Sequence, residues 1–360
     1  MRLLYVEDEG DFALQVKKAI EAGSKISVDS DEFILDQHIH HGGGNSTEIQ
    51  LARLIEERER VGGEYDAVLI DTDLSGLKNA ISQSAIRSAC SMIGLPVLRY
   101  SKAASPTASD RLKYLATISR EGSQALQVPV QVLTDGLAEW LTGILTSFKE
   151  IRRAIKASQE KQVGFSPQEI FASMLDEPDI DLDLLGYSGA NFIFFGELVN
   201  SKSEKVNQPR ERNYSTQLGY WLANYILMFP GPILNEGATA AYLGISRAEL
   251  SNDSIRKLLA DAKYNGPFAE ASTTGCYYIR RRLDRLILES DVESFAELCA
   301  KYEIHIANAD GSMRWYYCIV NDEPILEEDA VGPFDWIPRG ADICRIKKST
   351  YEQLAPWLGM

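Results

Sequence analysis

The hydrophobic positions of residues 1–160 alternate between short continuous apolar runs and longer amphipathic stretches. Continuous runs bounded by turn residues predict buried strands, and apolar residues three and four positions apart predict helices. Strands are predicted at 2–6, about 32–35, 65–71, 95–102 and 125–133, and helices at 10–22, 46–61, 78–93, 109–119 and 137–158. Strands that alternate with helices predict a parallel sheet covered by helices on both faces.

The run from Tyr65 to Asp71 is apolar and ends in a carboxylate, which a polar turn follows. Such a run is typical of a central parallel strand. In open α/β sheets, ligands bind just beyond the carboxyl ends of these strands. Asp71 therefore stands where a ligand or a covalent modification is expected. The alternative interpretation is that Asp71 only caps the following helix.

A second acidic group, formed by Glu7, Asp8 and Glu9, directly follows the first predicted strand. Adjacent carboxylates repel one another. A divalent cation such as Mg²⁺, which favours oxygen ligands, would offset that repulsion. The alternative interpretation is a solvated acidic turn.

Residues 1–150 resemble the receiver domain of two-component response regulators. The resemblance rests on motifs at successive strand ends, namely Leu3–Glu9, the strand that ends at Asp71, Leu74–Gly76 and Pro96–Ser101. It implies an α/β fold with a doubly wound, parallel, five-stranded sheet of the flavodoxin-like type. It also implies that Asp71 is the phosphoacceptor and that Glu7 and Asp8 hold Mg²⁺ with it. Ser101 matches the hydroxyl that senses the phosphoryl group.

The sequence departs from the receiver pattern after the fifth predicted strand. Receivers usually carry a lysine there, within a Lys-Pro pair, and this lysine contacts the phosphoryl group. The matching stretch here is Val132–Gly136, in which Asp135 replaces the amine. Lys102, which follows Ser101, could supply a cation from the neighbouring strand end. Two interpretations stay open: a working phosphoacceptor, and a pseudo-receiver whose site is not phosphorylated.

The segment between the first and third predicted strands is longer than a receiver usually has. It contains His38, His40 and His41, followed by three glycines. A metal site is one interpretation of the histidines, but consecutive glycines favour a loop.

The helix from 137 to about 160 is expected to connect the receiver-like region to residues 161–360. The pattern of this second region predicts a mostly helical α+β effector or interaction domain, with a possible split near 290–305. A helix start is predicted at Ser166 and Pro167. The acidic run 176–183 and the polar run 200–213 predict exposed loops, and another helix is predicted from Tyr214.

Residues 237–260 resemble the helix-turn-helix of bacterial transcription factors. Small residues lead into Leu243–Ser246, in which Gly244 permits a tight turn and Ser246 can cap a second helix. The resemblance implies that Arg247 and Arg256 contact DNA. The alternative interpretation is a structural helical corner.

Arg280, Arg281 and Arg282 form a dense cationic cluster. Such a cluster binds phosphate or nucleic acid, or pairs with carboxylates of the same protein. Pairing is expected here because the chain has a formal net charge of −15 and a pI near 4.9. This charge also disfavours a broad nonspecific grip on nucleic acid.

The five cysteines form no Cys-x-x-Cys pair, so neither a zinc ribbon nor a dithiol redox site is expected. Scattered thiols and the lack of a secretory-signal pattern predict a cytoplasmic protein. No apolar run approaches the length that spans a bilayer, so no membrane partner is expected. Residues 151–360 contain no Ser/His/Asp order, P-loop, nucleotide fingerprint or zinc-hydrolase motif. The chain is not predicted to be an enzyme, and the activity of residues 161–360 is left open.

The leading interpretation is a signalling protein in which Asp71, as phosphoacceptor or as part of a pseudo-receiver site, controls the second region. The expected partners are a sensor kinase or another signalling protein and a protein bound by the second region, with homodimer formation left open. Two alternatives are a DNA-binding transcriptional regulator that uses residues 237–260 and a non-catalytic scaffold subunit of a multiprotein complex.

Overall fold

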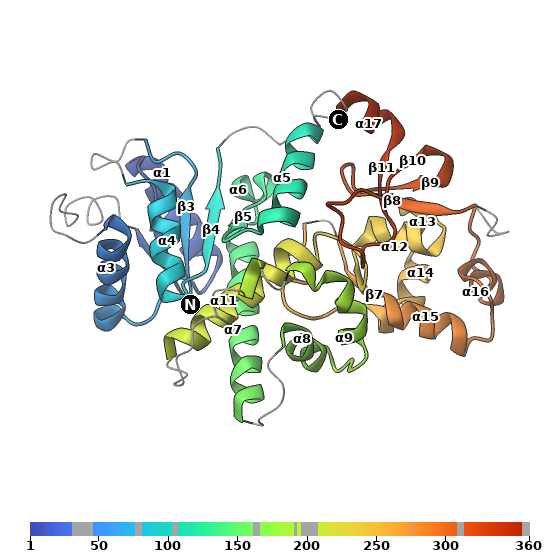
Figure 1. Ribbon diagram of the computed structural model, residues 1–360, viewed down its shortest axis with the longest axis horizontal. Coiled ribbons are helices and arrows are strands. Elements are labelled where there is room, and N and C mark those ends of the chain that lie inside the picture. Colours follow the sequence, from blue (N-terminus) through green and yellow to red (C-terminus); the bar gives the residue numbers. More distant parts are fainter. Residues whose placement is uncertain are drawn as a thin grey trace. The chain divides into compact units, whose positions relative to one another are not determined.

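The computed structural model describes residues 1–30, 46–75, 81–102, 107–160, 166–190, 193–195, 208–273, 275–307 and 313–354 (Figure 1). The strand predicted near 32–35, the histidine and glycine loop, and Gly76 lie outside the described residues. The chain forms two compact units. The first consists of Met1–Ser105, Ser123–Phe165 and Phe194–Trp221, and the second of Pro106–Gly122, Ser166–Ile193 and Leu222–Met360.

The first unit contains a sheet of five parallel strands in the order β2-β1-β3-β4-β5. The strands are β1 (Arg2–Val6), β2 (Ser27–Ser30), β3 (Ala67–Asp71), β4 (Val97–Tyr100) and β5 (Leu126–Gln127). The predicted parallel sheet is therefore confirmed, and β1, β3 and β4 form where apolar runs predicted them. Strand β2 was not predicted, because only Val28 of its four residues is buried and the pattern carries little signal.

Helices cover both faces of this sheet (Figure 1). On one face, α3 (Thr47–Gly62) and α4 (Gln83–Ile93) share a hydrophobic core with alternate residues of β1, β3 and β4. On the other face, α1 (Gly10–Gly23) contacts α7 (Leu137–Glu160), and Phe12 of α1 lies against Tyr100 of β4. The first unit is an α/β fold in which every residue of the central strand β3 is buried.

The end of the fifth strand differs from the prediction. Only Leu126 and Gln127 pair with β4, and Val130–Thr134 forms a short helix, α6. Pro129 has no N–H to donate to a neighbouring strand, and its fixed φ suits the start of a helix. The apolar residues after Pro129 are therefore helical. Asp135 lies beyond this helix and not at the strand end, so the placement of Asp135 opposite the receiver lysine was wrong.

The polar run 200–213 was also predicted wrongly in its described part. Helix α11 begins at Gln208 and continues to Trp221, so residues 208–213 are helical. Glu211 is buried and pairs with Arg152 of α7, and Arg212 pairs with Glu59 of α3. These ion pairs hold α11 within the first unit, which a composition-based prediction of an exposed loop could not detect.

The second unit combines short helices with two small sheets. One sheet is mixed, with the order β10-β11-β8-β9, and the other is the antiparallel pair β6-β7. Its strands are β6 (Ile233–Leu234), β7 (Tyr278–Ile279), β8 (Trp315–Cys318), β9 (Glu323–Leu326), β10 (Ala330–Val331) and β11 (Cys344–Lys347). The mostly helical α+β character predicted for this part of the chain agrees with these elements.

The helices of the second unit are short, with α5 (Ala108–Glu121) and α15 (Arg280–Glu289) among the longer ones. The others are α8 (Pro167–Leu175), α9 (Ile180–Asp183), η1 (Leu184–Tyr187), η2 (Leu222–Ile226), α12 (Glu236–Leu243), α13 (Arg247–Leu250), α14 (Asp253–Leu258), η3 (Ala260–Ala262), α16 (Phe295–Lys301), η4 (Glu327–Asp329) and α17 (Lys348–Leu354). The helix start predicted at Ser166 is confirmed, because the Ser166 hydroxyl and the Glu169 carboxylate form a reciprocal capping box.

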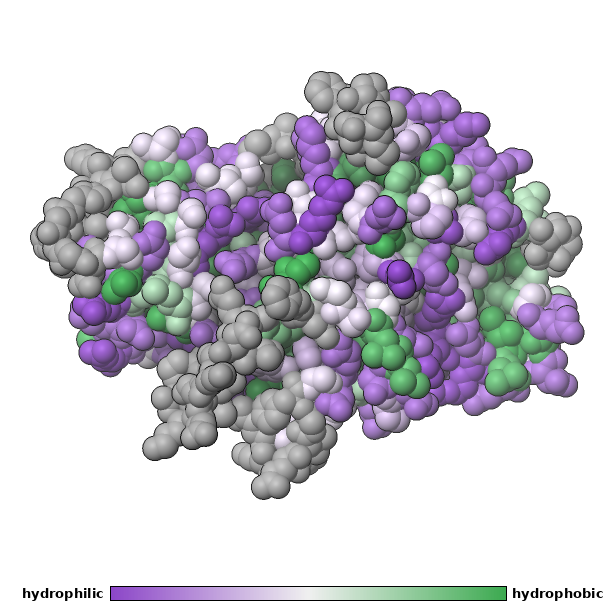
Figure 2. All heavy atoms as spheres, viewed as in Figure 1, coloured by the Kyte–Doolittle hydropathy of each residue, from purple (hydrophilic) through white to green (hydrophobic). Residues whose placement is uncertain are grey.

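Among the described residues, no helix has both the length and the apolar character that crossing a membrane requires. On the face shown in Figure 2, most of the coloured surface is hydrophilic or neutral, and hydrophobic residues form small separate groups.

Candidate acidic site at the carboxyl edge of the sheet

The sheet places the predicted acidic residues at one edge. Strands β1 and β3 are parallel neighbours with Val6 opposite Ile70, so the residues that follow, Glu7 and Asp71, emerge at the same edge. The strand order changes direction between β1 and β3, because β2 lies on one side of β1 and the later strands lie on the other. Ligand sites of open α/β sheets are found at this kind of switch point.

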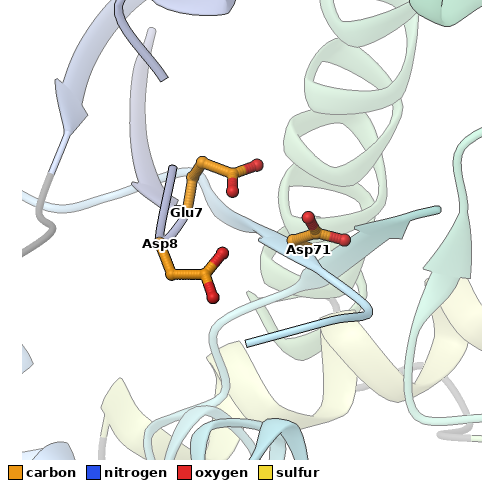
Figure 3. Close-up of side chains that lie close together, drawn as sticks. All are labelled: Glu7, Asp8 and Asp71. Atoms are coloured by element: carbon orange, nitrogen blue, oxygen red, sulfur yellow. The ribbon is translucent and has the colours of Figure 1, made fainter. Parts of the chain in front are cut away.

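The carboxyl groups of Glu7, Asp8 and Asp71 converge beyond the ends of β1 and β3 (Figure 3). One oxygen from each residue lies within 4.8 Å of the others. Glu7 is 1% exposed and Asp71 is 2% exposed, whereas Asp8 is partly exposed. Three hard oxygen donors, one of them open to solvent, suit Mg²⁺, which keeps several of its own waters when a protein binds it.

Lys102 reaches the same place from the end of β4. Its Nζ lies 3.1 Å from Glu7 Oε1, 3.1 Å from Asp71 Oδ2 and 3.2 Å from Glu9 Oε2. Burial alone would lower the pKa of Lys102, but the three carboxylates outweigh burial and raise the pKa above its usual value. The ammonium group also lies 4.5 Å from the centre of the Phe12 ring. Lys102 therefore stays charged and offsets part of the repulsion among the carboxylates.

Two buried tyrosines, Tyr5 and Tyr100, form a hydrogen-bonded support for the Glu7 carboxylate. The Tyr100 hydroxyl donates to Glu7 Oε2, and the hydroxyls of Tyr5 and Tyr100 lie 2.8 Å apart. The backbone N–H of Glu9 donates to the other Glu7 oxygen at 3.0 Å. Burial raises the pKa of Glu7, and hydrogen bonds from Tyr100, the Glu9 N–H and Lys102 offset part of this rise. The Glu7 carboxylate is thus fixed by donors on both oxygens.

Asp71 does not serve as a cap for the following helix. Ser82 caps α4, because its side chain accepts the N–H of Ala85. Asp71 Oδ1 instead accepts the N–H of Asp73 at 3.1 Å, which fixes the start of the turn after β3. Its other oxygen pairs with Lys102. The carboxylate is therefore held by the site and not by a helix terminus.

Sequence reasoning missed Tyr5, Tyr100 and Phe12 as parts of this site. The available signal was the spacing of Tyr5 two residues before Glu7, since alternate residues of a strand lie on the same face. A buried tyrosine hydroxyl also needs a hydrogen-bond partner. Ser101 follows Tyr100 at the end of β4 and is partly exposed, close in sequence to Lys102.

The helix-turn-helix prediction is correct in its turn and wrong in its second helix. Gly244 adopts a left-handed conformation after α12, and Ser246 caps α13. Helix α13 ends after four residues, and Asn252 caps a separate six-residue helix, α14. Ser246 and Asn252 each cap the start of a separate short helix, so no continuous second helix forms.

The arginines proposed for nucleic acid or anion contacts each pair with a carboxylate of the second unit. Arg247 lies 3.3 Å from Asp322 and Arg256 lies 3.6 Å from Glu236. The nearest pairs of the cationic cluster are Arg280 with Asp342 at 2.7 Å, Arg281 with Asp183, and Arg282 with Glu177 at 2.6 Å.

This pairing corrects the prediction of a solvated loop at 176–183. Glu177 is 6% exposed and accepts from both Arg282 and Arg285, and Ile180–Asp183 forms the short helix α9. The acidic run is ordered because it neutralises the arginines of α15. Its partners lie more than ninety residues away in sequence, so local composition could not reveal them.

A comparison of this chain with protein-family models, curated proteins and solved structures found no match.

Proposed function

We propose that the first unit is a receiver-like signalling module in which Asp71 accepts a phosphoryl group. The observation that carries this proposal is the convergence of Glu7, Asp8, Asp71 and Lys102 at one edge of a parallel sheet. Three carboxylates and an amine at successive strand ends are the groups that a phosphoacceptor site requires. The strand order β2-β1-β3-β4-β5, which is that of flavodoxin-like folds, supports the same proposal.

The residues of the site fit a magnesium ion. Glu7, Asp8 and Asp71 each offer a carboxylate oxygen within one small volume, and oxygen donors are the ligands that Mg²⁺ prefers. When bound, Mg²⁺ would neutralise the carboxylates and the negative charge of an incoming phosphoryl group. Lys102 places a second positive charge beside Asp71, in the role that the receiver lysine plays.

The chemistry assigned to Asp71 is nucleophilic. A carboxylate oxygen of Asp71 forms a bond to phosphorus while the bond from phosphorus to the donor's leaving group breaks, and the leaving group keeps the electron pair. Lys102 stabilises the charge on the transferred oxygens. Ser101, which follows β4, is the sensing hydroxyl in this proposal.

The lysine that receivers carry after the fifth strand has no counterpart at that strand end. Val128 precedes Pro129 there, and Val128 is apolar and fully buried. The amine must therefore come from β4, and this makes Lys102 the residue on which the proposal depends.

A pseudo-receiver is the second candidate, because Asp71 is 2% exposed and Lys102 already pairs with three carboxylates. In that case, Lys102 is the resident cation, and a signalling partner recognises the site without phosphoryl transfer. In both cases we propose that the site controls an interaction of residues 161–360 with a protein partner, and that a sensor kinase or another signalling protein acts on the first unit.

Intact-mass spectrometry after incubation with Mg²⁺ and a small phosphodonor such as acetyl phosphate tests the phosphoacceptor. The full chain should gain the mass of one phosphoryl group, and Asp71→Asn should gain none. Asp73→Asn is the matched control, since Asp73 is exposed and lies two residues further along the same turn. No gain in the unsubstituted chain would leave the pseudo-receiver as the function.

A further inference from the structure

The two buried carboxylates of the acidic site each have one oxygen that is held by a donor of the chain. Tyr100 donates its hydroxyl proton to Glu7 Oε2. The backbone N–H of Asp73 donates to Asp71 Oδ1 at 3.1 Å. The other two oxygens, Glu7 Oε1 and Asp71 Oδ2, face the site, because Lys102 Nζ lies 3.1 Å from each of them. Glu7 and Asp71 therefore each present a single oxygen to a cation.

The held oxygen of Glu7 is turned toward a pair of tyrosines. Tyr5 and Tyr100 are fully buried, and their hydroxyls lie 2.8 Å apart. The Tyr100 proton is committed to Glu7, so the contact between the two hydroxyls requires Tyr5 to donate to Tyr100. The Tyr5 hydroxyl also lies 3.5 Å from Glu7 Oε2. The two tyrosines thus occupy the space beside this oxygen, and a metal ion cannot approach it from their side.

Strand register builds this support. Tyr5 and Glu7 are two residues apart along β1 and its extension, so their side chains lie on the same face of the sheet. Tyr100 pairs with Asp71 in the register of β4 against β3. Because β3 lies between β1 and β4, the Tyr100 side chain reaches across the end of β3 to contact Glu7. The Tyr100 hydroxyl therefore holds Glu7 in one orientation relative to Asp71.

A set of single carboxylate oxygens discriminates between divalent cations. Mg²⁺ requires an octahedral arrangement, usually keeps several waters and binds through few carboxylates. Ca²⁺ takes about six to eight oxygens and often uses both oxygens of a carboxylate. Glu7 and Asp71 can offer only one oxygen each while their other oxygens are held. The arrangement therefore suits the ion that needs fewer protein ligands.

We propose that Tyr100 is a positioning residue that makes the acidic site selective for Mg²⁺ over Ca²⁺. This inference rests on the proposed function, in which a magnesium ion is held by Glu7, Asp8 and Asp71 (Figure 3). Loss of the Tyr100 hydroxyl frees Glu7 Oε2, and the carboxylate can then turn to offer both oxygens to a larger ion. Lys102 competes with either ion for the same two oxygens, so it changes both affinities and not their ratio.

Isothermal titration calorimetry of the full chain, first freed of metal with a chelator, tests this role with MgCl₂ and CaCl₂ at constant ionic strength. The unsubstituted chain should bind Mg²⁺ more tightly than Ca²⁺. In Tyr100→Phe, the ratio of the two affinities should fall by about fivefold, which corresponds to the contribution of one hydrogen bond. Tyr5→Phe should lower the ratio by less, because Tyr100 still donates to Glu7. This second variant carries the test if Tyr100→Phe does not fold.

Tyr65→Phe is the matched control. Tyr65 is another buried tyrosine of the first unit that donates to a carboxylate, that of Asp29, and it precedes β3, at the end of the strand away from Asp71. Its substitution should leave the ratio unchanged. Equal changes in the Mg²⁺ and Ca²⁺ affinities of Tyr100→Phe would show a merely structural role and overturn the inference, as would a preference of the unsubstituted chain for Ca²⁺. A chain that binds neither ion would instead overturn the magnesium site of the proposed function.

Discussion

The two faces of β4 carry charged side chains of opposite sign, and these charges differ in how they are paired. On the face that carries Tyr100, the acids beyond β1 and β3 share an in-chain cation, Lys102, and Glu7 accepts hydrogen bonds on both oxygens. On the other face, Arg87 and Arg99 have no acidic partner among the described residues. The first charge cluster is largely balanced within the chain, whereas Arg87 and Arg99 are half-buried with only their Nε atoms enclosed.

In the second unit, the charges of the arginine cluster are neutralised by carboxylates of the same chain. Glu177 accepts from Arg282 and Arg285, and Asp183 pairs with Arg281. With a net charge of −15, the chain has acids to spare. An arginine pair that lacks a carboxylate partner is therefore an exception in this chain. Three carboxylates that share one lysine amine are a second exception.

The largest effect is expected from Lys102→Met, which would leave Glu7 and Asp71 buried without their cation. Removal of one partner of a buried ion pair costs about 3 kcal/mol. The free energy of unfolding, measured by urea denaturation with a chelator present, should fall by about this amount. Saturating Mg²⁺ should restore most of the loss. Lys18→Met, at an exposed position of α1, is the control, and equal effects of the two substitutions would show that Lys102 does not balance the site.

A smaller loss is expected from Glu177→Gln, which breaks the balanced cluster of the second unit. Hydrogen bonds to charged groups contribute about 2 kcal/mol, and the free energy of unfolding at neutral pH should fall by a similar amount.

The same substitution has a pH signature. Burial alone would raise the pKa of Glu177, but Arg282 and Arg285 outweigh burial and lower it. A lowered pKa gives stability that is present above the ordinary value of 4.5 and is lost as the pH falls through the folded-state pKa. The difference in stability between the unsubstituted chain and Glu177→Gln should therefore shrink in acid, and a constant difference would contradict the assignment.

Tyr100→Phe should cost about 1 kcal/mol, because Glu7 Oε2 loses its strong donor but keeps the nearby Tyr5 hydroxyl, which lies 3.5 Å away. Tyr5→Phe is the matched comparison and should cost less, since Tyr100 still donates to Glu7. Urea denaturation of both variants gives the order, and the reverse order would place the main support of Glu7 at Tyr5.

Local sequence patterns predicted the strands that hold the acidic site. The runs ending at Val6 and Asp71 are continuous and apolar, and the run ending at Tyr100 is interrupted only by Arg99, so all three were recognised together with the residues at their ends. The length of strand β5 was overestimated, because a helix begins directly after Pro129 and includes the apolar residues that follow it. Apolar character alone does not distinguish a buried strand from a short buried helix.

Contacts between distant residues could not be predicted in the same way. The ion pairs of Glu177 with α15, those that hold α11 through Glu211 and Arg212, and the contact of Tyr100 with Tyr5 all depend on tertiary structure. Lys102 was predicted as a replacement amine from its position after Ser101, but its three simultaneous contacts follow from strand register.

The most direct measurement is to locate the phosphoryl group by peptide mass spectrometry after incubation of the full chain with Mg²⁺ and acetyl phosphate. We predict that one group is found, on the peptide that contains Asp71, and that Lys102→Met greatly reduces its amount. Phosphorylation at another residue, or none while Mg²⁺ binds normally, would contradict the assignment of Asp71 as the acceptor.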